Sequence, residues 1–139
     1  MAAVGFVGAG NMAGAIIGGV LKKGVYRPGD IVIYDILPQR VREMHATYGV
    51  ETAASEQEVA QKSRVLILAV KPDKVAAVLS RVKDDASRRL VISIAAGVSI
   101  ESIQAVIGEQ SCVVRVIPHT HSLVLEGASA LCASPPCTE

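Results

Sequence analysis

Residues 5–14 read GFVGAGNMAG, and the architecture of the chain follows most directly from this glycine-spaced segment. The apolar run Val4–Val7 comes directly before Gly8, and apolar residues at helical spacing come after the segment. In such a strand–turn–helix unit, Gly8 allows a tight turn, Gly10 lets a pyrophosphate approach the backbone, and Ala13 permits close packing of the helix on the strand. The segment therefore predicts a dinucleotide-binding turn, although a glycine-rich turn without a ligand has the same local pattern.

Short apolar runs recur along the rest of the chain and predict further buried strands. These runs lie at Ile31–Tyr34, Val65–Ala69, Leu90–Ile94 and Val113–Val116, with a weaker candidate at Val50–Thr52. Near-continuous apolar runs are typical of parallel strands that are covered on both faces.

Helical patterns separate the predicted strands. In the first helix, Met12, Ile16, Val20 and Leu21 are expected to share one apolar face. Proline at a helix start predicts helices from Pro38 and Pro72, and serine caps predict helices after Ser55 and Ser99. The alternation of strand and helix predicts an α/β fold of the Rossmann type, a doubly wound, mostly parallel sheet with helices on both faces.

The composition excludes several classes of protein. Half of the 139 residues are hydrophobic, the net charge is +1, and there is one Phe and no Trp. This balance provides neither a basic footprint nor stacking platforms for nucleic acid. No apolar run approaches the roughly 20 residues of a membrane span, so we expect a cytoplasmic protein without membrane or nucleic-acid partners. Residues 1–133 are expected to form the dinucleotide-binding domain, and residues 134–139 to begin a linker, because two prolines there break any strand.

The cysteine and histidine residues do not indicate a metal site. Cys112, Cys132 and Cys137 are an odd number without metal-like spacing, which predicts free thiols. His119 and His121 lack a third ligand of clear kind, so no metal is expected.

Asp35 stands directly after the predicted strand Ile31–Tyr34, where the dinucleotide fingerprint expects an acidic residue. A carboxylate there accepts hydrogen bonds from both ribose hydroxyls and repels a 2′-phosphate, which favours NADH. Two alternatives remain: Arg40 is near enough in sequence to reach a 2′-phosphate, and Asp35 can instead cap the helix that begins at Pro38.

Three further turns follow predicted strands at the edge of the sheet where ligands bind. They read AVKP at 69–72, AAG at 95–97 and PHTH at 118–121. Lys71 and His119 are the candidates for a catalytic acid, against the alternatives of a solvated ammonium and a surface loop residue.

With these turns placed, the chain resembles the N-terminal half of the pyrroline-5-carboxylate reductase family. The matching pieces are GFVGAGNMA, LAVKP, SIAAGVSIESI, RVIPHT and EGASAL, which occur in this order between Gly5 and Leu131. That family, which serves proline biosynthesis, reduces the cyclic imine 1-pyrroline-5-carboxylate to L-proline with NADPH or NADH. The resemblance implies that the first turn holds the pyrophosphate, that residues 69–72 and 95–97 line the ribose and nicotinamide, and that residues 115–120 approach the substrate.

Two departures from the family pattern bear on function. The family usually reads PNTP where this chain reads PHTH, and it usually has an asparagine near the adenosine half of the cofactor where this chain has Glu56. A glutamate there disfavours a 2′-phosphate. The candidate cofactor-binding residues are therefore Val7, Gly8, Ala9, Gly10, Asn11, Met12, Asp35, Glu56, Ala69, Val70, Lys71, Pro72, Ala95, Ala96 and Gly97.

The resemblance also implies a C-terminal helical domain that supplies the substrate pocket and the dimer interface. This chain is then expected to be the cofactor-binding half, inactive alone, and to form homo-oligomers only with that second domain. Two other functions stay open: a Rossmann domain of the β-hydroxyacid dehydrogenase type, and a stand-alone dinucleotide-binding module without catalysis.

Overall fold

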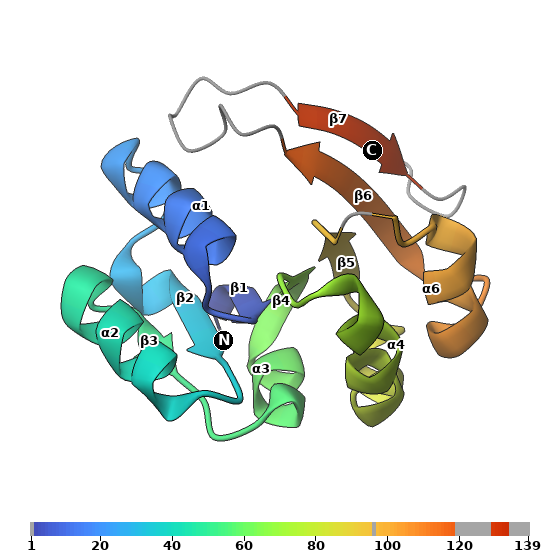
Figure 1. The fold of residues 1–139 in the computed structure, drawn as a ribbon, viewed down its shortest axis with the longest axis horizontal. Coiled ribbons are helices and arrows are strands. Elements are labelled where there is room, and N and C mark those ends of the chain that lie inside the picture. The colour runs from blue at the N-terminus through green and yellow to red at the C-terminus, as the bar shows by residue number, and fades with distance from the viewer. Residues whose placement is uncertain (1, 96, 119–128, 134–139) are drawn as a thin grey trace.

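The computed structural model describes residues 2–95, 97–118 and 129–133, which form a seven-stranded sheet in the order β3-β2-β1-β4-β5-β6-β7 (Figure 1). The strands are β1 (Ala2–Val7), β2 (Ile31–Tyr34), β3 (Glu51–Thr52), β4 (Ser63–Leu68), β5 (Leu90–Ser93), β6 (Cys112–Pro118) and β7 (Ser129–Ala133). Neighbouring strands from β3 to β6 pair in parallel, and β7 pairs antiparallel with β6 at the edge. The predicted Rossmann-type, mostly parallel sheet is confirmed.

The helices are α1 (Asn11–Lys22), α2 (Pro38–Tyr48), α3 (Glu56–Lys62), α4 (Pro72–Arg81), α5 (Lys83–Ala86) and α6 (Ile100–Ile107), with a short 3₁₀ helix, η1, at Pro28–Asp30. The helices α2, α3, α4 and α6 begin where the sequence places proline or a serine cap. Ser99 caps α6 by accepting the Ser102 N–H at 3.1 Å. The short elements η1 and α5 were not predicted, because neither spans enough residues to show a period.

Helix α3 has a modified capping box. The Ser55 hydroxyl accepts the Glu58 N–H at 3.1 Å, as predicted, but the Glu58 carboxylate accepts the N–H of Ala54 rather than that of Ser55. Hydrogen bonds from Lys62 and from the Ala54 N–H lower the pKa of Glu58. Both hydrogen bonds favour the ionised carboxylate at the start of α3, where the helix dipole also favours negative charge.

Helices cover both faces of the sheet and enclose two apolar cores. One core lies among the strands and α3 to α6, and the other lies among the strands, α1 and α2. Figure 1 shows the corresponding pairs, with α1 beside α2 and α4 beside α6. Val75, Val78 and Leu79 form the buried stripe of α4.

Helix α1 packs against both the sheet and α2. Of the residues predicted to share its apolar face, Ile16, Val20 and Leu21 are partly buried against the core. Ala13 and Ile17 of the same helix are fully buried in that core. A Cβ at Gly14 would lie 3.5 Å from Met44, and one at Gly18 would lie 3.1 Å from the Tyr48 hydroxyl oxygen. The two glycines therefore allow α2 to lie close to α1.

Two features near the end of the described chain were also not predicted. Strand β7 was missed because its short segment shows no clear alternation, and its pairing with β6 depends on the rest of the sheet. Cys112 is disulfide-bonded, so the expectation of free thiols is wrong for this residue. Residue spacing alone does not report which segments meet in space. No helix within the described ranges is both long enough and apolar enough to cross a membrane.

Gly5 is required by close packing in the centre of the sheet. A Cβ at this position would lie 2.6 Å from the Ser63 hydroxyl oxygen and 2.6 Å from a methyl carbon of Val59. We expect Gly5→Ala to lower the free energy of unfolding by about 1–3 kcal/mol, because the extra methyl group overpacks this core. Urea unfolding followed by circular dichroism measures the change. Gly29→Ala is the matched control, because nothing lies within 4 Å of a Cβ there. Equal unfolding midpoints for the two variants would contradict the expectation.

Candidate functional site

The glycine turn after β1 is wedged between the ends of β2 and β4. Gly8 has φ +105°, and its N–H donates to the Tyr34 carbonyl at 2.8 Å. A Cβ at Gly8 would lie 2.5 Å from the carbonyl oxygen of Ala69. Both the backbone conformation and the available space therefore require glycine at this position.

The N-terminus of α1 opens directly from this turn. Gly10 is the N-cap, no side chain caps the helix, and the first turn contains no acidic residue. A Cβ at Gly10 would meet only the Nη1 atom of Arg40, at 3.7 Å. The first N–H groups of α1 are thus presented without a side-chain acceptor at the positive end of a 12-residue helix, an arrangement that binds phosphate.

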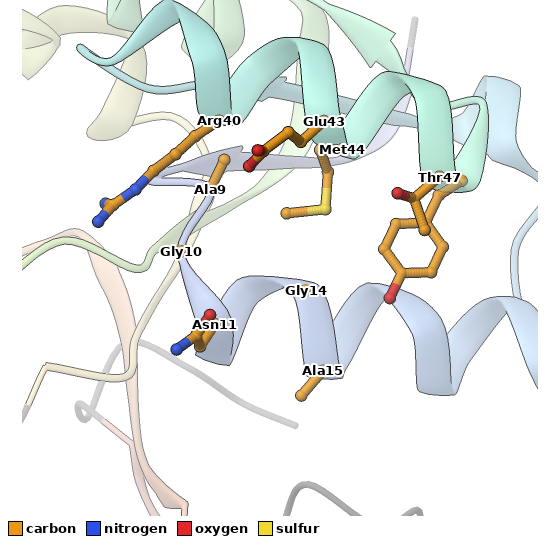
Figure 2. Close-up of a pocket in the computed structure, with 10 residues that line it drawn as sticks. Ala9, Gly10, Asn11, Gly14, Ala15, Arg40, Glu43, Met44 and Thr47 are labelled. Carbon is orange, nitrogen blue, oxygen red and sulfur yellow. The ribbon is translucent and has the colours of Figure 1, made fainter.

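A groove of about 440 Å³ runs from the glycine turn along the gap between α1 and α2 (Figure 2). It is lined by Ala9, Gly10, Asn11, Gly14 and Ala15 on one side and by Arg40, Glu43, Met44, Thr47 and Tyr48 on the other. Figure 2 shows the Arg40 side chain extending from α2 toward the turn. The α2 residues recur at spacings of three and four, so helical periodicity could have placed them on one face. Their position across from α1 was not predictable from that pattern.

Asp35 lies at the end of β2, as predicted, but its carboxylate is bound by the protein itself. Oδ2 accepts the N–H of Ala9 at 2.8 Å, and Oδ1 accepts the N–H of Leu37 at 2.8 Å. The Nη1 atom of Arg40 lies 3.7 Å from Oδ2. Asp35 is 8% exposed, whereas the Arg40 side chain is 49% exposed. The bond to Leu37, the N-cap of α2, agrees with the alternative that Asp35 stabilises the start of this helix.

The candidate residues after β4 lie beside the glycine turn, and those after β5 follow the next strand of the sheet. The N–H of Ala69 donates to the Val7 carbonyl at 2.8 Å, and the N–H of Ile94 donates to the Leu68 carbonyl at 3.2 Å. Lys71 is the N-cap of α4 and is exposed. The sheet order places β1, β4 and β5 side by side, so the turns that follow them share one edge. Ala96 and His119 lie outside the described residues.

Glu56 pairs with a basic residue of a neighbouring helix. Its carboxylate forms an ion pair with Arg81 at 3.0 Å, which joins the start of α3 to the end of α4. Glu56 does not line the groove between α1 and α2. Its contact with the adenosine half of a cofactor therefore stays a prediction.

Residues 3–97 match the family model described as NADP oxidoreductase, coenzyme F420-dependent. The chain belongs to this oxidoreductase family. Its similarity to pyrroline-5-carboxylate reductases is also confirmed. The enzyme of this name from Pasteurella multocida is 45% identical over 135 residues, which cover 92% of this chain and 48% of the relative.

Solved structures extend the similarity to the oxidoreductase fold. A pyrroline-5-carboxylate reductase from Coxiella burnetii is 33% identical and matches with a TM-score of 0.93, over 99% of this chain and 52% of that one. The Plasmodium falciparum pyrroline carboxylate reductase with NADP bound is 26% identical, with a TM-score of 0.87, over 99% of this chain and 50% of that one. The chain thus spans about half the length of the relatives it matches.

The residues present in this oxidoreductase domain fit a dinucleotide cofactor. The N–H groups at the start of α1 suit the pyrophosphate, and the backbone at Gly10 is open to the groove. Arg40 provides the one basic side chain among the residues that line the groove. The amides and the open backbone suit the pyrophosphate of a dinucleotide such as the NADP named in the family description.

Proposed function

We propose that this chain is the cofactor-binding half of an NAD(P)H-dependent reductase that converts 1-pyrroline-5-carboxylate to L-proline. The observation that carries the proposal is the uncapped N-terminus of α1, which opens from the glycine turn at the edge of the sheet. The similarity to pyrroline-5-carboxylate reductases over 92% of the chain supports the choice of substrate. The proposal includes a cytoplasmic setting and a homo-oligomer that forms through the second half of the protein.

Each turn has a proposed role in this site. The amides of Asn11 and Met12 bind the pyrophosphate, and residues 69–72 and 95–97 line the ribose and nicotinamide through backbone atoms. When bound, the reduced nicotinamide supplies the hydride that the imine carbon accepts. The chain's own contribution is to hold the cofactor in one orientation and to cover one side of it. Lys71 is exposed at the start of α4, and we assign it no proton-transfer step.

We expect NADH to bind more tightly than NADPH, by about tenfold. The charge of Arg40 is already balanced by Asp35 at 3.7 Å, so the groove offers a 2′-phosphate little net positive charge. Fluorescence titration of the chain with each cofactor measures both dissociation constants. Tighter binding of NADPH would contradict the preference, and no binding of either cofactor at millimolar concentration would contradict the dinucleotide site itself.

The Arg40 charge can be tested in the same titration. Arg40→Gln leaves the Asp35 carboxylate without its cationic partner, so the discrimination against NADPH should increase by a further severalfold. Arg42→Gln is the matched control. Arg42 lies on the same helix but does not line the groove between α1 and α2. The control should leave the ratio of the two dissociation constants unchanged.

A further inference from the structure

The contacts of Asp35 are those of a residue that holds the glycine turn. Its carboxylate accepts the N–H of Ala9, a residue 26 positions earlier and in the middle of the turn. The second carboxylate oxygen accepts the N–H of Leu37, at the start of α2. Asp35 thereby links the turn after β1 to the turn after β2. A ribose-binding role alone does not account for two backbone hydrogen bonds from a carboxylate that is 8% exposed.

Backbone atoms of the two neighbouring strand ends hold Gly8. On one side the Gly8 N–H donates to Tyr34, and on the other Gly8 packs against the Ala69 carbonyl. Within the part of the chain that the structure describes, the side chain that accepts a hydrogen bond from residues 8–10 is that of Asp35. Ala9 directly precedes the N-cap of α1, so the position of its peptide sets the direction of the amides that follow.

We propose that Asp35 is a positioning residue that pre-orients the turn for pyrophosphate. The proposal rests on the dinucleotide site proposed above. By fixing Ala9, the carboxylate holds Gly10 and Asn11 in the orientation that a phosphate needs, before any ligand arrives. Pre-orientation of this kind increases affinity because the turn is already ordered in the free protein, so binding does not have to order it. The loss of Asp35 therefore weakens any ligand with a pyrophosphate at this turn, whether or not it carries ribose hydroxyls.

An asparagine at this position cannot reproduce both contacts. The two N–H groups point at two different carboxylate oxygens, and asparagine has one acceptor oxygen and one NH₂ donor. Asp35→Asn keeps the size of the side chain but places a donor against one of the two N–H groups. Hydrogen bonds to a charged acceptor are also about twice as strong as neutral ones.

Binding of ADP and of 2′,3′-dideoxy-ADP separates positioning from ribose recognition. Calorimetry on the wild-type chain and on Asp35→Asn is expected to show the same loss for both ligands, about tenfold or more. A loss for ADP alone, with dideoxy-ADP unaffected, would assign Asp35 to the ribose hydroxyls and overturn the proposal. An unchanged affinity for both ligands would overturn it as well. If the wild-type chain binds neither ADP nor NADH, the proposed function itself fails.

The matched control is Asp30→Asn. The Asp30 carboxylate also accepts a backbone N–H, from Arg27 at 3.0 Å, but it lies just before β2, whereas Asp35 follows that strand. This variant should bind both nucleotides as the wild type does. A loss of nucleotide affinity in Asp30→Asn equal to that in Asp35→Asn would mean that general destabilisation explains both, and would overturn the proposal.

A measurement on the wild type keeps the proposal testable even if Asp35→Asn does not fold. The hydrogen bond from the Ala9 N–H to Asp35 Oδ2 is expected to give a scalar coupling between the Ala9 amide nitrogen and the Asp35 carboxyl carbon in the free chain. We expect this coupling to persist when ADP binds. Its disappearance in the ADP complex would show that Asp35 leaves the turn for the ribose, and would overturn the proposal.

Discussion

The 139-residue chain, supplied with NADH and pyrroline-5-carboxylate, should reduce the imine at least about 10⁵-fold more slowly than a protein that also carries the second half of the reductase. The chain spans 48% of the length of its Pasteurella multocida relative, and in the proposed site it covers one side of the cofactor. In this proposal the groups that orient the imine against the nicotinamide lie in the second half, and their loss removes roughly 7–11 kcal/mol of positioning. Acid catalysis by a residue such as Lys71 contributes only about 10²–10⁴-fold and does not make up this loss.

The assay follows the loss of NADH absorbance in the presence of pyrroline-5-carboxylate. The chain is compared with a fusion in which the second half of the Pasteurella multocida relative continues from Glu139. The same fusion with Gly10→Val is the control, because its activity should fall with cofactor binding. Equal rates for the chain and the fusion would contradict the need for a second half. The catalytic groups would then have to be sought in the segment PHTH at residues 118–121.

Gly10→Val should weaken NADH binding on the order of 100-fold, which corresponds to about 3 kcal/mol, and leave the stability of the fold unchanged. Gly10 has φ −85°, a backbone conformation open to any residue. The protein also has room for a side chain, since only Arg40 lies within 4 Å of a Cβ at this position. That room is the space into which a pyrophosphate must come, so the valine methyl groups exclude it. Fluorescence titration and thermal unfolding measure the two quantities.

Gly8→Ala is the informative counterpart. Gly8 has φ +105°, and a Cβ at this position would lie 2.5 Å from the carbonyl oxygen of Ala69. We therefore expect Gly8→Ala to lower the stability of the fold. The pair of variants thus separates a glycine needed for the fold from one needed for the ligand. A Gly10→Val chain that binds NADH as the wild type does would contradict the placement of the pyrophosphate. If Gly10→Val unfolds at a clearly lower temperature than the wild type, the expectation that it affects ligand binding alone is contradicted.

Local sequence signals were sufficient for most of the fold. The strand Ile31–Tyr34 has the predicted bounds, and helices begin at Pro38 and Pro72 as predicted. These features are predictable because apolar runs, fixed proline φ angles and serine caps act within a few residues. The dinucleotide fingerprint is equally local, since its glycines and the strand before them lie within one short segment.

Contacts between residues distant in the sequence could not be predicted from these local signals. Asp35 accepts a hydrogen bond from a residue 26 positions away, and Glu56 pairs with Arg81 across 25 positions. The sequence pattern is the same whether the Asp35 carboxylate faces a ribose or the N–H of Ala9. The choice depends on how closely β1 and β2 bring their following turns together, and on how α2 places Arg40 beside the carboxylate. Packing of the helices on the sheet fixes these distances, and no local propensity encodes them.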